Sequence, residues 1–200
     1  KHTLPGDNDI SYYHEYDADI KLVWINRDAG VVQSNEVMSF TIMTESDKKF
    51  EYPLTTWTFV DSDDNTCKVN DPEITINGIA MTRLSSRSIR SGNCIKTTTT
   101  VPLKGAKQYS IRYSRIKRYN INQDYFIGLK SAFIINNLTV ELELPDGIEA
   151  TFVPRGTIEE FEEVKKSKQN IKMRYKGVIF PKQGYIFALK AIQPQTTSQL

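Results

Sequence analysis

The sequence predicts an all-β domain with one short helix, built as an antiparallel β-sandwich or a flattened barrel of about nine or ten strands. Three observations support this prediction. Apolar and polar residues alternate at period two along most of the chain, and turn-forming residues separate the alternating runs. The ten Tyr and nine Phe suit half-buried sheet surfaces. Because 39% of the residues are hydrophobic, we expect residues 1–200 to share one core as a single domain.

The first half of the chain contains six predicted strands, at residues 17–25, 36–43, 55–60, 74–81, 97–103 and 108–113. The first is apolar on both faces, which favours a strand buried on both sides. We expect Trp24 and Trp57 to lie in the core. Asn77-Gly78 interrupts the fourth run, which indicates a tight turn or a bulge. The fifth is rich in threonine and is typical of an edge or solvated strand.

The second half contains the clearest predicted hairpin. Alternating residues 138–144 precede Pro145-Asp146-Gly147, where Pro restricts φ and Gly accepts a positive φ, and we expect residues 148–152 to return antiparallel. Residues 122–135 fit either a helix or a strand, and we favour a strand. Two further strands are predicted, at 171–176 and 185–189. The ends, residues 1–9 and 193–200, are expected to fray.

One helix is predicted to begin at Thr157. Thr157 and Glu160 have the spacing of a capping box, in which each side chain accepts a hydrogen bond from the other residue's backbone amide. Ile158, Phe161 and Val164 then recur every three residues and form one narrow apolar stripe. We expect this helix to cover the outside or the end of a sheet.

The N-terminal residues are polar and include neither an initiator Met nor the apolar core of a signal peptide. We therefore expect the chain to be a piece of a longer protein. No run approaches the roughly 18 apolar residues that span a bilayer, so no membrane span is predicted. Cys67 and Cys94 are too few for a disulfide framework and fit a reducing compartment equally well. We expect a cytoplasmic location, or an extracellular one if the two are oxidised.

Charge is distributed very unevenly along the chain. Residues 1–82 contain 6 basic and 15 acidic residues, whereas residues 83–130 contain 11 basic residues and one acid, Asp124. The near-neutral total therefore hides a strongly basic middle segment. Such a segment either pairs with the acidic part of its own fold or binds an anionic partner.

The candidate binding residues lie in this basic segment. Arginine offers a planar fork for phosphate or carboxylate, and aromatic rings offer stacking surfaces. The candidate anion-binding residues are Arg87, Arg90, Arg112, Arg115, Lys117 and Arg118, with Tyr113 and Tyr119 as stacking partners. Along a strand, the first and last bases of 112–118 share one face and the middle two share the other. A bulge or strand end near Ser114 is needed to gather all four on one surface.

Metal binding is not predicted. The acidic loop at residues 61–65 resembles the start of a calcium loop, but Thr66 replaces the required glycine and Pro72 replaces the required glutamate. His2 and His14 are the only histidines, and no zinc-binding spacing is present. We therefore expect no metal and no cofactor.

Catalytic chemistry has little support in the sequence. Glu141 and Glu143 lie on one strand face at a spacing that suits an acid–base pair, but simple alternation explains them. Arg155 precedes the predicted helix N-terminus and could form a small anion site with its amides, although an ordinary loop is the better interpretation. No glycine-rich phosphate loop and no nucleophile motif is present.

The sequence thus favours a non-enzymatic recognition or sensor module whose anionic partner is a nucleotide-like ligand, a nucleic acid or an acidic protein surface. A first alternative is a structural interaction domain, in which the basic segment pairs with the acidic first third within one chain or within a homo-oligomer. A second is an extracellular adhesion or carbohydrate-binding sandwich with oxidised cysteines and an exposed tryptophan. In its layout, the chain resembles accessory sensor or interaction domains of bacterial signalling proteins, although no motif carries this resemblance.

Overall fold

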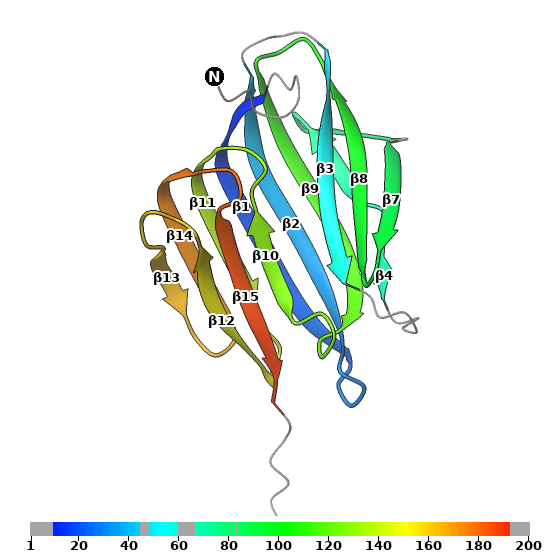
Figure 1. The fold of residues 1–200 in the computed structure, drawn as a ribbon, viewed down its shortest axis with the longest axis vertical. Helices are drawn as coiled ribbons and strands as arrows, with labels where there is room; N and C mark the ends of the chain where they lie inside the picture. The colour runs from blue at the N-terminus through cyan, green and yellow to red at the C-terminus, as the bar shows by residue number, and fades with distance from the viewer. Residues whose placement is uncertain (1–9, 45–48, 60–66, 83, 193–200) are drawn as a thin grey trace, which may run out of the picture.

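The computed structural model describes residues 10–44, 49–59, 67–82 and 84–192. Within these ranges, the chain forms fifteen strands in three sheets and contains no helix (Figure 1). The predicted all-β class is confirmed, and the layering is that of a sandwich, without a closed barrel. None of the described residues belongs to a helix long and apolar enough to cross a membrane.

The largest sheet has nine strands and forms the back layer in Figure 1. In spatial order they are β13 (Glu162–Lys166), β14 (Asn170–Ile179), β11 (Ile135–Glu143), β1 (Ile10–Asn26), β2 (Val31–Thr44), β9 (Gln108–Asn120), β5 (Glu73–Ile76) and β6 (Ile79–Ala80), with β4 (Lys68–Val69) also paired to β9. The pairing of β1 with β11 is parallel, and the other pairings are antiparallel. The sheet is therefore mixed, whereas the sequence predicts an antiparallel one.

Two three-stranded sheets lie in front of this layer in Figure 1, one toward each side. The first consists of β10 (Phe126–Lys130), β15 (Gly184–Ala191) and β12 (Ile148–Arg155). The second consists of β3 (Phe50–Phe59), β8 (Cys94–Leu103) and β7 (Ser85–Ser91). One core of buried side chains extends between the large sheet and both small ones.

Aromatic clusters hold each small sheet to the large one. Phe40 on β2 and Tyr13 on β1 pack against Tyr52 of β3, and the hydroxyls of Tyr13 and Tyr52 lie 2.7 Å apart. On the other side, Phe161 bridges Tyr175 of β14 and the rings of β12 and β15. Fully burying one such side chain contributes about 1.5–3 kcal/mol, so these clusters are major sources of cohesion between the layers.

The predicted hairpin at residues 138–152 is wrong in its pairing. The turn forms, with Gly147 at φ 83°, but β11 pairs with β1 and β14 while β12 pairs with β15. The turn thus carries the chain from the large sheet to a small one. Alternation shows that each strand buries one face, but it does not distinguish strands that lie side by side from strands that face each other across a core.

The predicted helix at Thr157 is also wrong. Residues 157–161 are irregular, with a bend at residues 158–159, and the residues that follow pair with β14 as the edge strand β13. Of the predicted stripe, Phe161 is buried, but Ile158 is 77% exposed. A short helix needs a partner to cover its apolar stripe, whereas the free edge of β14 offers backbone hydrogen bonds directly.

The remaining strand and turn predictions agree with the structure, except that β1 buries one face and exposes Asp17, Asp19 and Lys21 on the other. The ends that are expected to fray, residues 1–9 and 193–200, lie outside the described residues. Asn77-Gly78 forms a tight turn between β5 and β6, with φ of 50° and 79°. The ambiguous segment 122–135 contains a strand, β10, as favoured. The predicted strands of the first half all occur, although several are longer than predicted, since β1 and β2 have 17 and 14 residues.

We predict that Phe187→Ala lowers the free energy of unfolding by about 3–5 kcal/mol, because this ring is fully buried against Phe152 and Tyr185. Urea denaturation followed by far-ultraviolet circular dichroism measures the change. The matched control is Phe126→Ala on the neighbouring strand, where the ring is 45% exposed and the expected loss is under about 1 kcal/mol. Equal losses for the two variants would contradict the layering.

Candidate functional site

Strand β9 contains four of the predicted anion-binding bases, and its pairing with β2 is continuous from Gln108 to Asn120. No bulge occurs at Ser114, so the strand keeps strict alternation along its whole length. Arg112 and Arg118 are exposed on the outward face, whereas Arg115 and Lys117 face inward. The four bases therefore do not form one surface.

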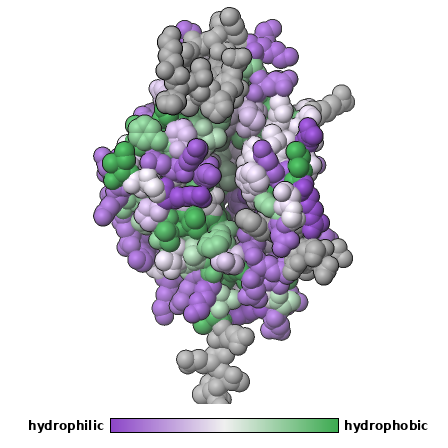
Figure 2. Space-filling model, viewed as in Figure 1, coloured by the Kyte–Doolittle hydropathy of each residue, from purple (hydrophilic) through white to green (hydrophobic). Residues whose placement is uncertain are grey.

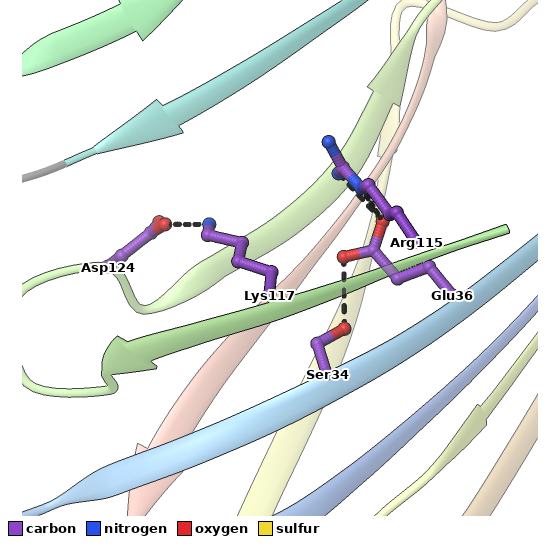
Figure 3. Close-up of polar contacts among 5 residues, drawn as sticks. All are labelled: Ser34, Glu36, Arg115, Lys117 and Asp124. Carbon is purple, nitrogen blue, oxygen red and sulfur yellow. Dashed lines mark hydrogen bonds and ion pairs between the residues drawn. The ribbon is translucent and has the colours of Figure 1, made fainter. Parts of the chain in front are cut away.

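Arg115 lies directly opposite Glu36 on β2 (Figure 3). Its Nε and Nη2 each lie 2.7 Å from Glu36 Oε2, and Ser34 Oγ donates to Glu36 Oε1 at 2.9 Å. The two charged side chains are only 11% and 6% exposed. Burial alone would lower the pKa of Arg115, but the Glu36 carboxylate and the Tyr113 hydroxyl outweigh it and raise that pKa. Arg115 is therefore charged, and Glu36 neutralises it inside the protein.

Lys117 is neutralised in the same way. Its Nζ contacts Asp124 Oδ2, and both side chains are buried (Figure 3). The same Nζ lies 4.3 Å from the centre of the Tyr119 ring. Asp124 follows the turn at residues 121–123 after β9 and is the one acid of segment 83–130. Tyr113 and Tyr119 are themselves buried, which raises the pKa of both phenols. The predicted stacking role on an external ligand does not fit these two buried rings.

The buried polar side chains around Arg115 and Lys117 do not all have hydrogen-bond partners. Arg115 Nη1 and the Tyr119 hydroxyl are buried and have no hydrogen-bond partner among the described residues. Unpaired buried polar atoms cost free energy, typically about 1–3 kcal/mol each. Among the described residues, Glu36–Arg115 is also the one ion pair that joins the acidic first third to the basic segment. It is the kind of contact that the structural-domain alternative expects.

A basic aromatic surface does exist, but on the outer side of β3, β8 and β7. Trp57 is 54% exposed, which contradicts the expectation that it lies in the core, and Lys96 Nζ lies 5.5 Å from its ring centre. Lys96 pairs in register with Trp57 on one side and Ile89 on the other. Arg87, opposite Thr98, belongs to the next row. We call the surface formed by these five side chains the Trp57 face.

The Trp57 face is basic because acids are scarce on its sheet. Within residues 50–59, 85–91 and 94–103, Glu51 is the single acid, while Arg87, Arg90 and Lys96 are basic. None of these three bases forms an ion pair with a described residue. In Figure 2, pale and hydrophilic residues predominate over this sheet, whereas hydrophobic residues gather over the sheet of β10, β15 and β12.

The predicted set is thus distributed over four places. Arg115, Lys117 and both tyrosines are internal, and Arg87 belongs to the Trp57 face. Arg90 lies on the same edge strand, β7, three residues after Arg87 and therefore on its opposite face. Its Nε donates to the Gly92 carbonyl at 3.2 Å. Arg112 and Arg118 lie on the outward face of the large sheet, where Arg118 Nε donates to Gln33 Oε1 at 2.9 Å.

Sequence reasoning missed Trp57 and Lys96 as surface residues. The available signal was the threonine run at 97–100, which predicts a solvated strand and hence a polar outer face for whatever pairs with it. The pairing of β8 with β3 could not be known from the sequence. Without it, nothing indicated that Trp57 shares a row with Lys96.

A cavity of about 270 Å³ lies on the inner side of the same small sheet, between it and the β4–β5 segment. Hydroxyl groups dominate its lining, from Thr56, Thr58, Ser88, Thr97, Thr99 and Tyr113. Asp71 is the charged residue among the described lining, which contains no lysine or arginine. The prediction of anion binding therefore does not extend to this cavity.

Several other candidates have no supporting geometry. Cys94 is a free thiol, so the Cys67–Cys94 disulfide that the adhesion alternative requires is not formed. Across the described ranges, no three His, Cys, Asp or Glu side chains gather as metal ligands.

The acidic loop at residues 61–65 and Arg83 lie outside the described residues. Arg155 ends β12 and is exposed, and the helix N-terminus that its anion site requires is absent.

Glu141 and Glu143 form ion pairs with lysines on neighbouring strands. Lys172 Nζ lies 2.8 Å from Glu141 Oε2, and Lys21 Nζ lies 2.9 Å from Glu143 Oε2. Hydrogen bonds from Lys172 and Asn170 lower the pKa of Glu141. These carboxylates therefore stabilise the outward face of the sheet, as alternation suggests.

We predict that Arg115→Met lowers the free energy of unfolding by about 3–5 kcal/mol, because Glu36 is left buried without its partner. The double variant Glu36→Met, Arg115→Met should recover most of that loss, since no unpaired charge remains. Arg112→Met, on the outward face of the same strand, serves as the control with an expected loss under about 1 kcal/mol. Urea titrations measure all three, and a double variant no more stable than the single one would refute the buried pair.

We predict that Lys172→Gln lowers stability at pH 7 by up to about 1 kcal/mol and that this difference disappears in acid. The folded-state pKa of Glu141 is depressed, so its stabilisation is complete above the unfolded pKa of about 4.3 and is lost as the pH falls through the folded value. Urea midpoints at pH 7 and near pH 2.5 test this. Lys168→Gln, at an exposed lysine with no ion pair to a described residue, is the control. A difference that grows in acid would have the wrong sign.

No family model matches this sequence, and no curated protein matches it. Among solved structures, a "putative nutrient binding protein" from Legionella pneumophila is similar with a TM-score of 0.50 and 11% identity, covering 90% of this chain and 67% of that one. An M1 zinc metallopeptidase from Deinococcus radiodurans has a TM-score of 0.41 and 12% identity, and yeast LTA4 hydrolase has 0.44 and 8%. Both matches cover 90% of this chain, but they cover only 42% of the metallopeptidase and 29% of the hydrolase. At such identities, the first similarity shows a shared fold, and the other two carry no further argument.

Proposed function

We propose that this chain is a non-enzymatic recognition module that binds an anionic partner through the Trp57 face. The observation that carries the proposal is the exposed Trp57 ring beside Lys96, on a face that also contains Arg87 and on a sheet with a single acid. The anionic partner expected from the sequence is retained. Of the binding residues, Arg87 belongs to the set predicted from the sequence, whereas Trp57 and Lys96 are new.

The chemistry of the face suits an anion with an attached planar or apolar group. Arg87 offers a bidentate fork, Lys96 offers a point charge, and Trp57 offers a broad ring for stacking. Both cations lack an ion-pair partner among the described residues, so an incoming anion displaces no internal carboxylate. Arg115 and Lys117 differ in this respect, because Glu36 and Asp124 already neutralise them.

A second candidate, carbohydrate binding, has one observation in its favour. An exposed tryptophan next to threonine hydroxyls, here Thr55 and Thr98 on the same face, is also suited to stacking on a sugar ring. The two candidates differ in their dependence on salt. Binding of a neutral oligosaccharide is insensitive to ionic strength, whereas binding of an anion weakens as salt screens the charges.

We predict that fluorescein-labelled decaglutamate or oligothymidylate binds the protein at low salt, and that the double variant Arg87→Ala, Lys96→Ala weakens this binding by roughly tenfold. Trp57→Ala should weaken it further where the probe contains bases. Fluorescence anisotropy at two salt concentrations measures both effects.

The matched control is Arg112→Ala, Arg118→Ala, which removes two exposed arginines from the large sheet and should leave the affinity unchanged. Binding that both double variants retain would place the site elsewhere. Failure of both probes to bind at low salt would remove the proposal, and salt-independent binding of a neutral oligosaccharide through Trp57 would favour the second candidate.

A further inference from the structure

We propose that β7 accepts an acidic, extended segment of a partner protein as an added strand at the edge of its sheet. This inference rests on the proposed function, because it specifies which anionic partner the Trp57 face receives. In strand addition, backbone hydrogen bonds supply affinity and the neighbouring side chains supply specificity. The edge must be free, regular and long enough to pair.

Five of the six sheet edges in the described part of the chain are unsuited to strand addition. β3 and β12 contain Pro53 and Pro154, and β13 has a break in register and is charged at every residue except Val164. β6 and β4, which together form the other edge of the large sheet, have two residues each, and β10 has five. Prolines, charges, irregular pairing and short length are the usual means by which proteins prevent edge-to-edge association.

β7 lacks the proline, the irregular pairing and the short length of the other edges, and its only charges are two arginines. It is seven residues long, contains no proline, and pairs with β8 in unbroken register from Ser85 to Ser91. All seven residues are exposed, and the strand lies at the rim of the molecule in Figure 1. Its second row of backbone amides and carbonyls therefore faces outward, toward any chain that approaches along the edge.

The charges of β7 specify the partner. Arg87 and Arg90 are three residues apart, so they project from opposite faces of the strand, and Ile89 shares the face of Arg87. An antiparallel partner strand has one residue opposite each of them. Charge pairing across strands then favours the order acid, apolar, any residue, acid, with the first acid opposite Arg90.

A second copy of this chain is a poor occupant of the same edge. Residues 85–91 contain two arginines and no acid, so two β7 strands side by side would bring four arginines into one short ribbon. Like charges on paired strands are destabilising. The same arginines that discourage self-association therefore favour an acidic partner.

The experiment uses a labelled, end-blocked nine-residue peptide of alternating Thr and Val with Glu-Val-Thr-Glu at its centre. Two N-methylated versions are also made. One carries methyl groups on the odd-numbered backbone nitrogens, and the other carries them on the even-numbered ones. In a strand, alternate amides point to the same side, so one version blocks the amides that face β7 and the other blocks those that face solvent. Charge and side chains are identical in all three peptides.

We expect the unmodified peptide to bind, one N-methylated version to lose affinity by roughly tenfold or more, and the other to keep it. Arg87→Glu, Arg90→Glu should abolish binding, whereas Arg112→Glu, Arg118→Glu should not. Hydrogen exchange of residues 85–91 should slow on addition of the peptide, which reports pairing directly.

Two results would overturn strand addition while leaving the proposed function intact. In one, all three peptides bind alike and all depend on Arg87, which indicates charge recognition without backbone pairing. In the other, the peptide fails to bind while decaglutamate or oligothymidylate still binds through Lys96 and Arg87. If no anionic probe binds at all, both proposals fail together.

Discussion

The unbroken pairing of β2 with β9 is the constraint on which the rest of the structure depends. Because the register never shifts between Gln108 and Asn120, every side chain of β9 is assigned to the inside or the outside by its position alone. That assignment places Arg115 opposite Glu36 and turns Lys117 toward Asp124. It also buries Tyr113 and Tyr119, and it leaves Arg112 and Arg118 in solvent.

The consequence is a stripe of charge in the middle of an otherwise apolar face. Buried ion pairs contribute little net stability against apolar replacements, but they are costly to break. Here, they constrain which strand register is acceptable, since a one-residue slip of β9 would bury Arg118 or Arg112 without Glu36 or Asp124 opposite. Two separate aromatic clusters hold the small sheets to the large one. One consists of Tyr13, Phe40 and Tyr52, and the other of Phe152, Phe161 and Tyr185.

The basic segment therefore has two roles within one stretch of sequence. Its inward bases are part of the architecture, because acids of the same chain neutralise them. Its outward bases have no ion-pair partner among the described residues, and one of them, Lys96 on β8, lies beside an exposed tryptophan. The net charge of the segment thus overstates the positive charge at the surface, because Glu36 and Asp124 neutralise Arg115 and Lys117 inside the protein.

The sequence by itself determined the all-β class, most strand positions and the Asn77-Gly78 turn, because these follow from local alternation and turn chemistry. It also determined which residues share a face of one strand. Only the tertiary structure decided which face is inside, which strands are neighbours and which segments change sheet, as residues 145–147 and 157–166 illustrate. The physical reason is that period-two alternation repeats within each strand but contains no information about pairing partners. Arg115 could be assigned to Glu36, and Trp57 to Lys96, only after those partners were known.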